Sequence, residues 1–223
     1  MDWGYFVLGG IFVGAALLML YNARHRRAVE QELVRRGLRP CEEEAPALQE
    51  AFTGLAGGHG GVPPRRYEVS RCFKRATGRA TVYRFSVLDR SHDSDHDHNV
   101  VGAAYDAYLV HLPDGTRVSP TPISIMLSPR VPRAIRTVMA GLAAAEPFGQ
   151  PLAVPDGGQI LAAWGETRRP LDEVVSAATQ ERLVRGAEVG VLSAHFREAR
   201  AAFTVNPQQK MVEPQWSWIV DWT

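Results

Sequence analysis

The stretch RRYEVSRCFKRATGRATVYRFSVLDR (residues 65–90) predicts a β-hairpin, and this hairpin points to a sheet-containing fold. Its first half alternates strictly, which places Tyr67, Val69, Arg71 and Phe73 on one face of a strand. Its second half alternates through Tyr83, Phe85 and Val87. The segment ATGR between the two halves supplies a turn, because glycine and short polar residues suit tight reversals of the chain.

Further strand and helix patterns follow this hairpin. Residues 100–113 predict a third strand, and Asp114–Gly115 predicts a hairpin turn into a returning strand at 117–127. Pro120 and Pro122 place part of that returning strand at a sheet edge, since proline donates no ladder hydrogen bond. Helices are expected at 129–149 and 169–186, and strands at 159–165, 187–196, 199–206 and 216–222. This order predicts an α+β domain, with a mostly antiparallel sheet and two or three helices on one face.

Residues 3–21, WGYFVLGGIFVGAALLMLY, are the most apolar part of the sequence and predict a single transmembrane helix. The run holds 19 residues without a charge. A helix of that length spans about 28 Å, close to the roughly 30 Å of a bilayer hydrocarbon core. Tryptophan and tyrosine stand near its ends, where they favour the membrane interfaces.

Three arginines follow this run and predict its orientation. Arg24, Arg26 and Arg27 are expected at the membrane surface on the cytoplasmic side, because positive residues are retained there. The N-terminus would then face outward, and the domain would be cytoplasmic at a bacterial-type inner membrane. A cleaved signal peptide would carry its basic residues before the apolar run and a small-residue cleavage site after it. An uncleaved anchor is therefore predicted.

Gly10 and Gly14 stand four residues apart within the apolar run and predict a helix-packing face. Small side chains at this spacing let a second transmembrane helix approach closely. The expected partners are thus integral-membrane protein subunits and the lipid bilayer.

The residues between the anchor and the hairpin predict a connector. Residues 22–37 continue as a helix, 41–52 form a second short helix, and 54–64 (GLAGGHGGVPP) are a glycine- and proline-rich linker. The sequence therefore divides into an anchor at 1–22, a juxtamembrane helix and linker at 23–64, and an α+β domain at 65–223.

Composition argues against several functions. The chain has 223 residues and a net charge of +1, so it lacks the basic surplus of a nucleic-acid binder. Cys41 and Cys72 lack zinc-ligand spacing, and a cytoplasmic location predicts that both are reduced. The sequence contains no G-x-S-x-G and no H-E-x-x-H motif. Neither a catalytic residue nor an organic cofactor is predicted.

The segment SHDSDHDHN (residues 91–99) holds three histidines and three aspartates. Imidazole and carboxylate groups bind zinc, manganese and nickel, so the candidate metal ligands are His92, Asp95, His96 and His98. The spacing does not match a calcium loop, which needs glycine at its sixth position and glutamate at its twelfth. A polar loop between two strands is the alternative interpretation.

The C-terminal segment QWSWIVDWT (residues 215–223) predicts a strand with Trp216, Trp218 and Trp222 on one face. Such a face buries a large apolar area when it is covered. Two interpretations stay open: the strand closes the domain's own core, or the tryptophans form a partner interface.

These features predict a non-enzymatic accessory subunit that braces an integral-membrane complex from the cytoplasmic side. By architecture alone, one N-out helix with a cytoplasmic β-rich domain resembles the H subunit of photosynthetic reaction centres, and respiratory or transport complexes fit equally. The alternative is a membrane-tethered metal-binding module or enzyme that uses the histidines and aspartates of residues 92–98.

Overall fold

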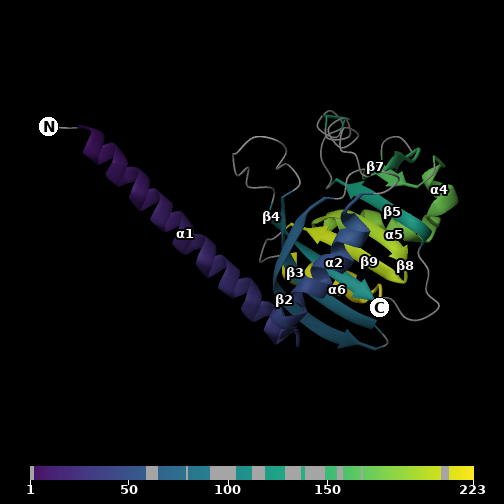
Figure 1. The fold of residues 1–223 in the computed structure, drawn as a ribbon, viewed down its shortest axis with the longest axis horizontal. Coiled ribbons are helices and arrows are strands. Elements are labelled where there is room, and N and C mark those ends of the chain that lie inside the picture. Colours follow the sequence, from purple (N-terminus) through teal and green to yellow (C-terminus); the bar gives the residue numbers. More distant parts are fainter. Residues whose placement is uncertain are drawn as a thin grey trace.

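Residues 65–90 form the hairpin that their alternation predicts. Strand β2 (Tyr67–Thr77) pairs antiparallel with β3 (Ala80–Asp89). The fold is that of a computed structural model, shown in Figure 1. It describes residues 3–58, 65–78, 80–90, 104–111, 119–128, 137–138, 149–154, 158–166, 168–206 and 211–223.

A β-bulge interrupts β2. The register shifts between Ser70 and Phe73, and Arg71 has a φ of 56°. The bulge inserts one extra residue, so that Phe73 lies on the face of Ser70, and Cys72 packs with Val69. The strict alternation expected for this strand, with Val69, Arg71 and Phe73 on one face, is therefore wrong.

One nine-stranded sheet contains this hairpin, in the order β1-β2-β3-β4-β9-β8-β5-β7-β6. Every pairing between these strands is antiparallel. The other strands are β1 (Arg39–Pro40), β4 (Ala104–His111), β5 (Ser119–Leu127), β6 (Gln150–Pro151), β7 (Ile160–Gly165), β8 (Val191–Glu198) and β9 (Arg200–Val205). The predicted α+β class with a mostly antiparallel sheet is confirmed.

Strand β5, which follows Asp114 and Gly115 in the sequence, does not pair with β4, and Asp114 and Gly115 themselves lie outside the described residues. β9 and β8 lie between β4 and β5, and β5 is a central strand between β8 and β7. The hairpin and the edge position predicted for this segment are both wrong. Pro120 and Pro122 are accommodated because they lie in a register irregularity between Ser119 and Ile123, where ladder bonds are interrupted.

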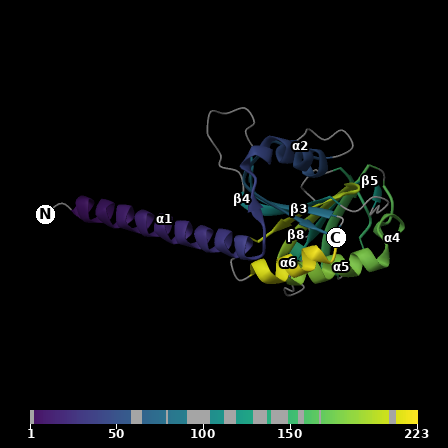
Figure 2. The same ribbon diagram turned by 90° about the horizontal axis from the view of Figure 1, so that it is seen from below.

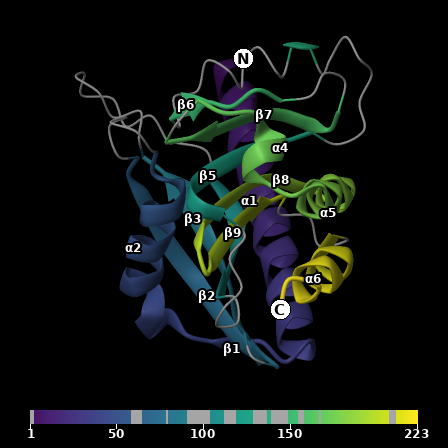
Figure 3. The same ribbon diagram turned by 90° about the vertical axis from the view of Figure 1, so that its right-hand side faces the viewer.

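Helices cover both faces of the sheet, as Figures 2 and 3 show. Helix α2 (Ala45–Ala56), which follows the 3-10 turn η1 (Glu42–Glu44), packs on one face with its own apolar cluster. On the other face lie the inner end of α1 (Trp3–Arg35), α5 (Ala177–Glu188) and α6 (Val212–Val220). The expectation that all helices share one face is wrong, because both faces of the central strands are apolar.

The C-terminal segment is a helix, α6, and the predicted strand there is wrong. Trp216, Trp218 and Trp222 are each 6% exposed. Trp218 and Trp222 pack against the ring of Phe203, with ring centroids at 4.9 and 5.1 Å. Gly186 of α5 permits this packing, because an added Cβ would lie 2.5 Å from the Trp218 indole. The tryptophans thus pack in the core of the domain, and their role as a partner interface stays a prediction.

A break divides the helix expected at 169–186 into α4 (Leu171–Val174) and α5. Val175 adopts an extended conformation, and Ser176 then caps α5 by accepting a hydrogen bond from the Thr179 N–H at 3.3 Å. Of the helix expected at 129–149, residues 137–138 are helical, and most of the rest lies outside the described residues.

Helix α1 runs without interruption from Trp3 to Arg35, and its N-terminal half points away from the domain (Figures 1 and 2). Its outer apolar residues Leu17, Met19, Leu20 and Tyr21 are 58–72% exposed. Among the residues that the structure describes, no helix is found that is both long enough and apolar enough to cross a membrane.

Side chains from the segment expected as a juxtamembrane helix and linker, residues 23–64, pack into the apolar core. Leu33, Leu38, Leu48 and Phe52 are all buried in the two main apolar clusters. The Tyr67 hydroxyl also donates to the carbonyl of Ala56 at 2.9 Å, which ties α2 to the hairpin. Core packing therefore includes residues well before the boundary predicted at residue 65, and residues 59–64 lie outside the described residues.

Candidate binding groove at the base of the long helix

A groove of about 450 Å³ separates α1 from the sheet, directly after the apolar run. Residues of α1 from Asn22 to Glu30 line one wall, and β2, β3 and β4 form the other. Its polar lining consists of Asn22, His25, Arg26, Glu30, Ser70, Arg71, Arg84, Ser86 and Asp106. Polar groups from four separate elements converge here, which is typical of a binding site.

The β-bulge supplies Arg71 to this groove. The backbone N–H groups of Arg71 and Cys72 donate to the Glu42 carboxylate at 3.1 and 2.8 Å. These bonds hold Arg71 in a left-handed conformation, which costs a non-glycine residue about 1–2 kcal/mol. Its guanidinium lies 4.0 Å from the carboxylate of Glu30 on α1. The bulge therefore directs one arginine across the groove toward the helix.

Arg84 and Asp106 form a buried ion pair in the sheet wall. An Arg84 nitrogen lies 2.7 Å from one Asp106 oxygen, and the Ser86 hydroxyl donates to the other at 2.8 Å. Arg84 is 5% exposed, and its guanidinium carbon lies 5.7 Å from the centre of the Tyr108 ring. Its Nε is buried and has no hydrogen-bond partner among the described residues. A buried N–H without a partner costs about 1–3 kcal/mol.

Cations outnumber carboxylates in the groove lining. The lining has three arginines (Arg26, Arg71 and Arg84) and two carboxylates (Glu30 and Asp106), so these five side chains carry a formal charge of +1. Arg26 is exposed, and no carboxylate of the described ranges pairs with it. Guanidinium groups bind oxyanions through several N–H donors at once, so this groove suits a monoanion with multiple acceptor oxygens.

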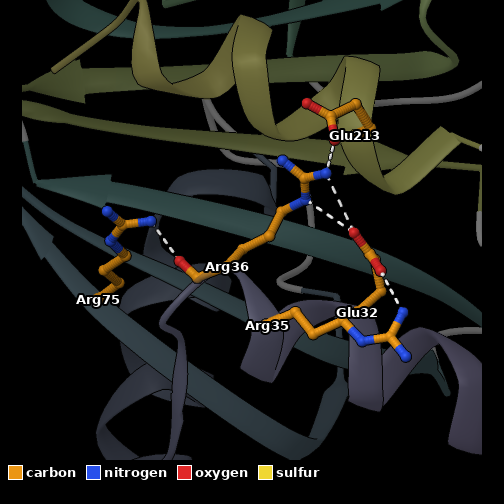
Figure 4. A network of polar contacts seen from close by, with 5 residues as sticks. All are labelled: Glu32, Arg35, Arg36, Arg75 and Glu213. Carbon is orange, nitrogen blue, oxygen red and sulfur yellow. Dashed lines mark hydrogen bonds and ion pairs between the residues drawn. The ribbon is translucent and has the colours of Figure 1, made fainter.

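An ion-pair network fixes the base of α1 beside the groove (Figure 4). Arg36 contacts Glu32, at 3.0 Å, and also Glu213 of α6. Arg75 of β2 donates to the Arg36 carbonyl, and its guanidinium carbon lies 5.3 Å from the centre of the Trp216 ring. These contacts join α1 to both β2 and α6, so the direction of the long helix is set by the domain.

A second polar cluster lies beneath α2, and its Ser124–His195 pair is closed to solvent. Ser124 Oγ and His195 Nδ1 are 2.9 Å apart, Ser193 Oγ lies 2.9 Å from His195 Nε2, and Thr204 lies 2.6 Å from Ser193. Ser124 and His195 are 1% and 3% exposed, and the Phe52 ring covers the imidazole. A serine–histidine pair acts as a nucleophile only where substrate reaches it, so this chain of hydroxyls has a structural role.

The two cysteines are free and fully buried. Burial raises the pKa of Cys41 to about 11, with the nearby Glu44 carboxylate acting in the same direction. Burial, reinforced by Glu42, raises the pKa of Cys72 to about 12. Because the thiolate is the reactive form, neither thiol is suited to nucleophilic chemistry near neutral pH.

The residues predicted to act at the membrane all lie on α1. Gly10 and Gly14 fall within the helix. Arg24, Arg26 and Arg27 are exposed just after the apolar run, and Arg26 lines the groove.

The predicted metal ligands His92, Asp95, His96 and His98 lie outside the described residues. Within the ranges that the structure describes, no group of three or more His, Cys, Asp or Glu side chains is placed to hold a metal ion. The metal site therefore stays a prediction.

Sequence reasoning did not identify the Arg84–Asp106 pair. One signal was present: each is a charged residue with apolar or aromatic neighbours inside a strand. The register places Ser86 opposite Asp106 and Arg84 opposite Tyr108, which brings the two charges together. That register is a property of the folded sheet and could not be read from either strand alone.

Comparison of the chain with protein-family models, with curated proteins and with solved structures finds no match.

Proposed function

We propose that this chain is a non-enzymatic accessory subunit, anchored in a membrane by residues 3–21, whose cytoplasmic domain braces a larger integral-membrane complex. The observation that carries the proposal is the continuity of α1 from the apolar run into the core of the domain. A stiff connection of this kind holds the domain at a fixed distance and angle from whatever the outer half of the helix contacts.

The dimensions of α1 fit this role. The helix has 33 residues and is therefore about 50 Å long. The apolar run accounts for about 28 Å of that length, close to the hydrocarbon thickness of a bilayer. The remaining turns carry Arg24, Arg26 and Arg27 and then enter the domain. Cytoplasmic retention of these arginines gives the N-out orientation.

Exposure along the helix supports the same arrangement. Leu17, Leu20 and Tyr21 share one side of α1, whereas Met19 lies on another, and all four are exposed. A helix that is apolar all round favours a lipid or protein environment over water. Gly10 and Gly14, one helical turn apart, offer a face on which a second transmembrane helix would pack.

The test is co-purification from native membranes solubilised in mild detergent, with a tag on the C-terminus. We expect stoichiometric integral-membrane partners. Gly10→Leu should release those partners while the chain stays in the membrane, because the larger side chain separates the helices. Gly9→Leu, on an adjacent side of the helix, is the matched control and should retain them. A lone chain or a self-dimer would contradict the proposal.

Metal analysis of the purified chain tests the rival proposal, a metal-binding module at residues 92–98. That function requires a stoichiometric divalent metal in protein purified without a histidine tag. It also requires that His96→Ala with His98→Ala removes the metal, whereas an accessory subunit tolerates both changes.

A further inference from the structure

We propose that the groove between α1 and strands β2–β4 binds the headgroup of an anionic phospholipid, in the class of phosphatidylglycerol. The inference rests on the proposed membrane anchor, because that anchor places the groove at the bilayer surface. It deepens the proposed function by assigning a lipid ligand to one defined site.

The depth of the groove along α1 matches the headgroup layer. Asn22 is the first residue after the apolar run, and Arg26 lies four residues further, about 6 Å along the helix axis. A bilayer is roughly 40–45 Å thick with headgroups and about 30 Å without, so each headgroup layer is about 5–8 Å deep. The part of the α1 wall from Asn22 to Arg26 therefore lies at the level of lipid phosphates.

The donors in the groove suit a phosphodiester. Arg26 and Arg71 approach from opposite walls of the groove, and the Arg84 guanidinium lies in the sheet wall. Arginine binds phosphate through paired N–H donors. The formal charge of +1 matches the single negative charge of a phosphodiester, whereas a phosphatidylcholine headgroup carries no net charge.

The acceptors in the groove select a hydroxyl-bearing headgroup. The carboxylates of Glu30 and Asp106 and the hydroxyl of Ser70 line the same space. A glycerol headgroup donates hydrogen bonds to such groups, whereas a trimethylammonium group has no N–H or O–H to donate. Val29 and Phe73 add apolar surface to the domain end of the groove, away from the bilayer. Phosphatidylglycerol should therefore be preferred over phosphatidylcholine.

The experiment uses the full chain in a neutral detergent and titrates it with three probes: short-chain phosphatidylglycerol, short-chain phosphatidylcholine and glycerol 3-phosphate. Native mass spectrometry gives the number of molecules bound, and calorimetry gives the Kd. We expect one phosphatidylglycerol per chain. Arg26→Gln and Arg71→Gly should each weaken its binding about tenfold or more, since each removes charge-assisted hydrogen bonds.

Two matched variants control for general effects. Arg24→Gln removes a neighbouring exposed arginine that does not line the groove. Glu198→Gly relaxes the other described non-glycine residue with a left-handed backbone, with a φ of 54°, at the β8–β9 turn. Arg71→Gly itself favours that backbone conformation, so lost binding with retained stability would assign the effect to the guanidinium. Both control variants should bind like the parent chain.

Several results would overturn the proposal. Three results would show diffuse attraction and no headgroup site. These are phosphatidylglycerol binding that does not saturate, a loss of affinity in Arg24→Gln as large as in Arg26→Gln, and equal affinity for phosphatidylcholine and phosphatidylglycerol. Equal affinity for glycerol 3-phosphate would assign the groove to a free phosphate compound. The anchor is tested separately by alkaline extraction of membranes. If alkali extracts the chain but phosphatidylglycerol binding is saturable, the anchor is rejected and the site is kept. If the chain stays in the membrane but phosphatidylglycerol binding is not saturable, the site alone is rejected.

Discussion

The two halves of α1 are one continuous helix with opposite surroundings. In the outer half, Leu17 and Met19 are 61% and 72% exposed, and apolar side chains lie on more than one side. In the inner half, Val29 and Leu33 are 6% and 0% exposed and belong to the domain core. The outer half has many apolar residues and the inner half has few, yet it is the few of the inner half that the domain buries.

This difference shows that the pattern of apolar residues matters more than their number. The inner half presents a narrow stripe that fits against the sheet and α6, with charged residues around it. The apolar residues of the outer half are spread around the helix. A domain packed against one side of it would therefore leave the other apolar residues uncovered. The following predictions test whether the two halves serve different environments.

The largest effect is expected from charges at the middle of the apolar run. Phe12→Asp together with Val13→Asp should detach the chain from membranes, because each aspartate at the centre of a membrane helix costs about 2.5–3.5 kcal/mol. Alkaline extraction of membranes, followed by detection of the chain in the supernatant, measures the result. Val34→Asp is the matched control, since Val34 is 54% exposed on the inner half, and this variant should stay in the pellet. Equal retention of both variants would refute the anchor.

The next largest effect is expected on the stability of the domain, where the inner half of α1 should matter and the outer half should not. Leu33→Ala should destabilise the domain by about 2–5 kcal/mol, because it leaves a cavity at a fully buried site. Leu17→Ala in the outer half should change the free energy of unfolding by less than about 0.5 kcal/mol. Denaturant unfolding in mild detergent, followed by tryptophan fluorescence, gives both values. Similar values for the two variants would show that the halves do not differ in this way.

The sequence predicted the local elements well, because their signals are local. Alternation identified β2 and β3, and apolar runs identified β7, β8 and β9. Strand order was predicted less well. The sheet pairs β4 with β9, which is distant in sequence, and no pattern within either strand specifies that partner.

The C-terminal helix was missed for a different reason. Trp216, Trp218 and Trp222 are spaced by two and four residues, and the even spacing fits one face of a strand. The spacing of four between Trp218 and Trp222 also fits a helix, and the packing of Trp218 against Gly186 of α5 supports the helical solution.

The candidate groove was the least predictable feature. The position of Arg71 depends on a bulge whose N–H groups are held by Glu42, a residue about 30 positions earlier in the chain. Arg84 and Asp106 meet through strand register. The exposed arginines of α1 were recognised in the sequence, but the wall that faces Arg26 was not.

A third prediction concerns α6, which packs against the inner half of α1. Gly186→Ala should destabilise the domain by about 1–3 kcal/mol, because the new Cβ would lie 2.5 Å from the Trp218 indole and the helices would separate. Gly54→Ala is the control: its Cβ would meet nothing within 4 Å, so helix propensity should stabilise the domain by up to about 1 kcal/mol. Thermal unfolding compares the two variants, and a stabilised Gly186→Ala would contradict the close packing of α5 and α6.

The smallest effect is expected at the ion pair between α6 and α1. Glu213→Gln removes the carboxylate that contacts Arg36, but the Glu213 side chain is 59% exposed. Exposed ion pairs contribute about 0–1 kcal/mol, and salt screens them, so the loss should be below about 1 kcal/mol and should vanish at high ionic strength. Unfolding measured at low and high salt, with Leu33→Ala in parallel, separates the charged contact from the apolar one. If the Glu213 variant lost as much stability as Leu33→Ala, the packing of α1 on the domain would depend on charge. A small, salt-sensitive loss would mean that the buried apolar residues of the inner half set the direction of α1. The ion pair would then only refine the orientation of a helix that apolar contacts already hold in place.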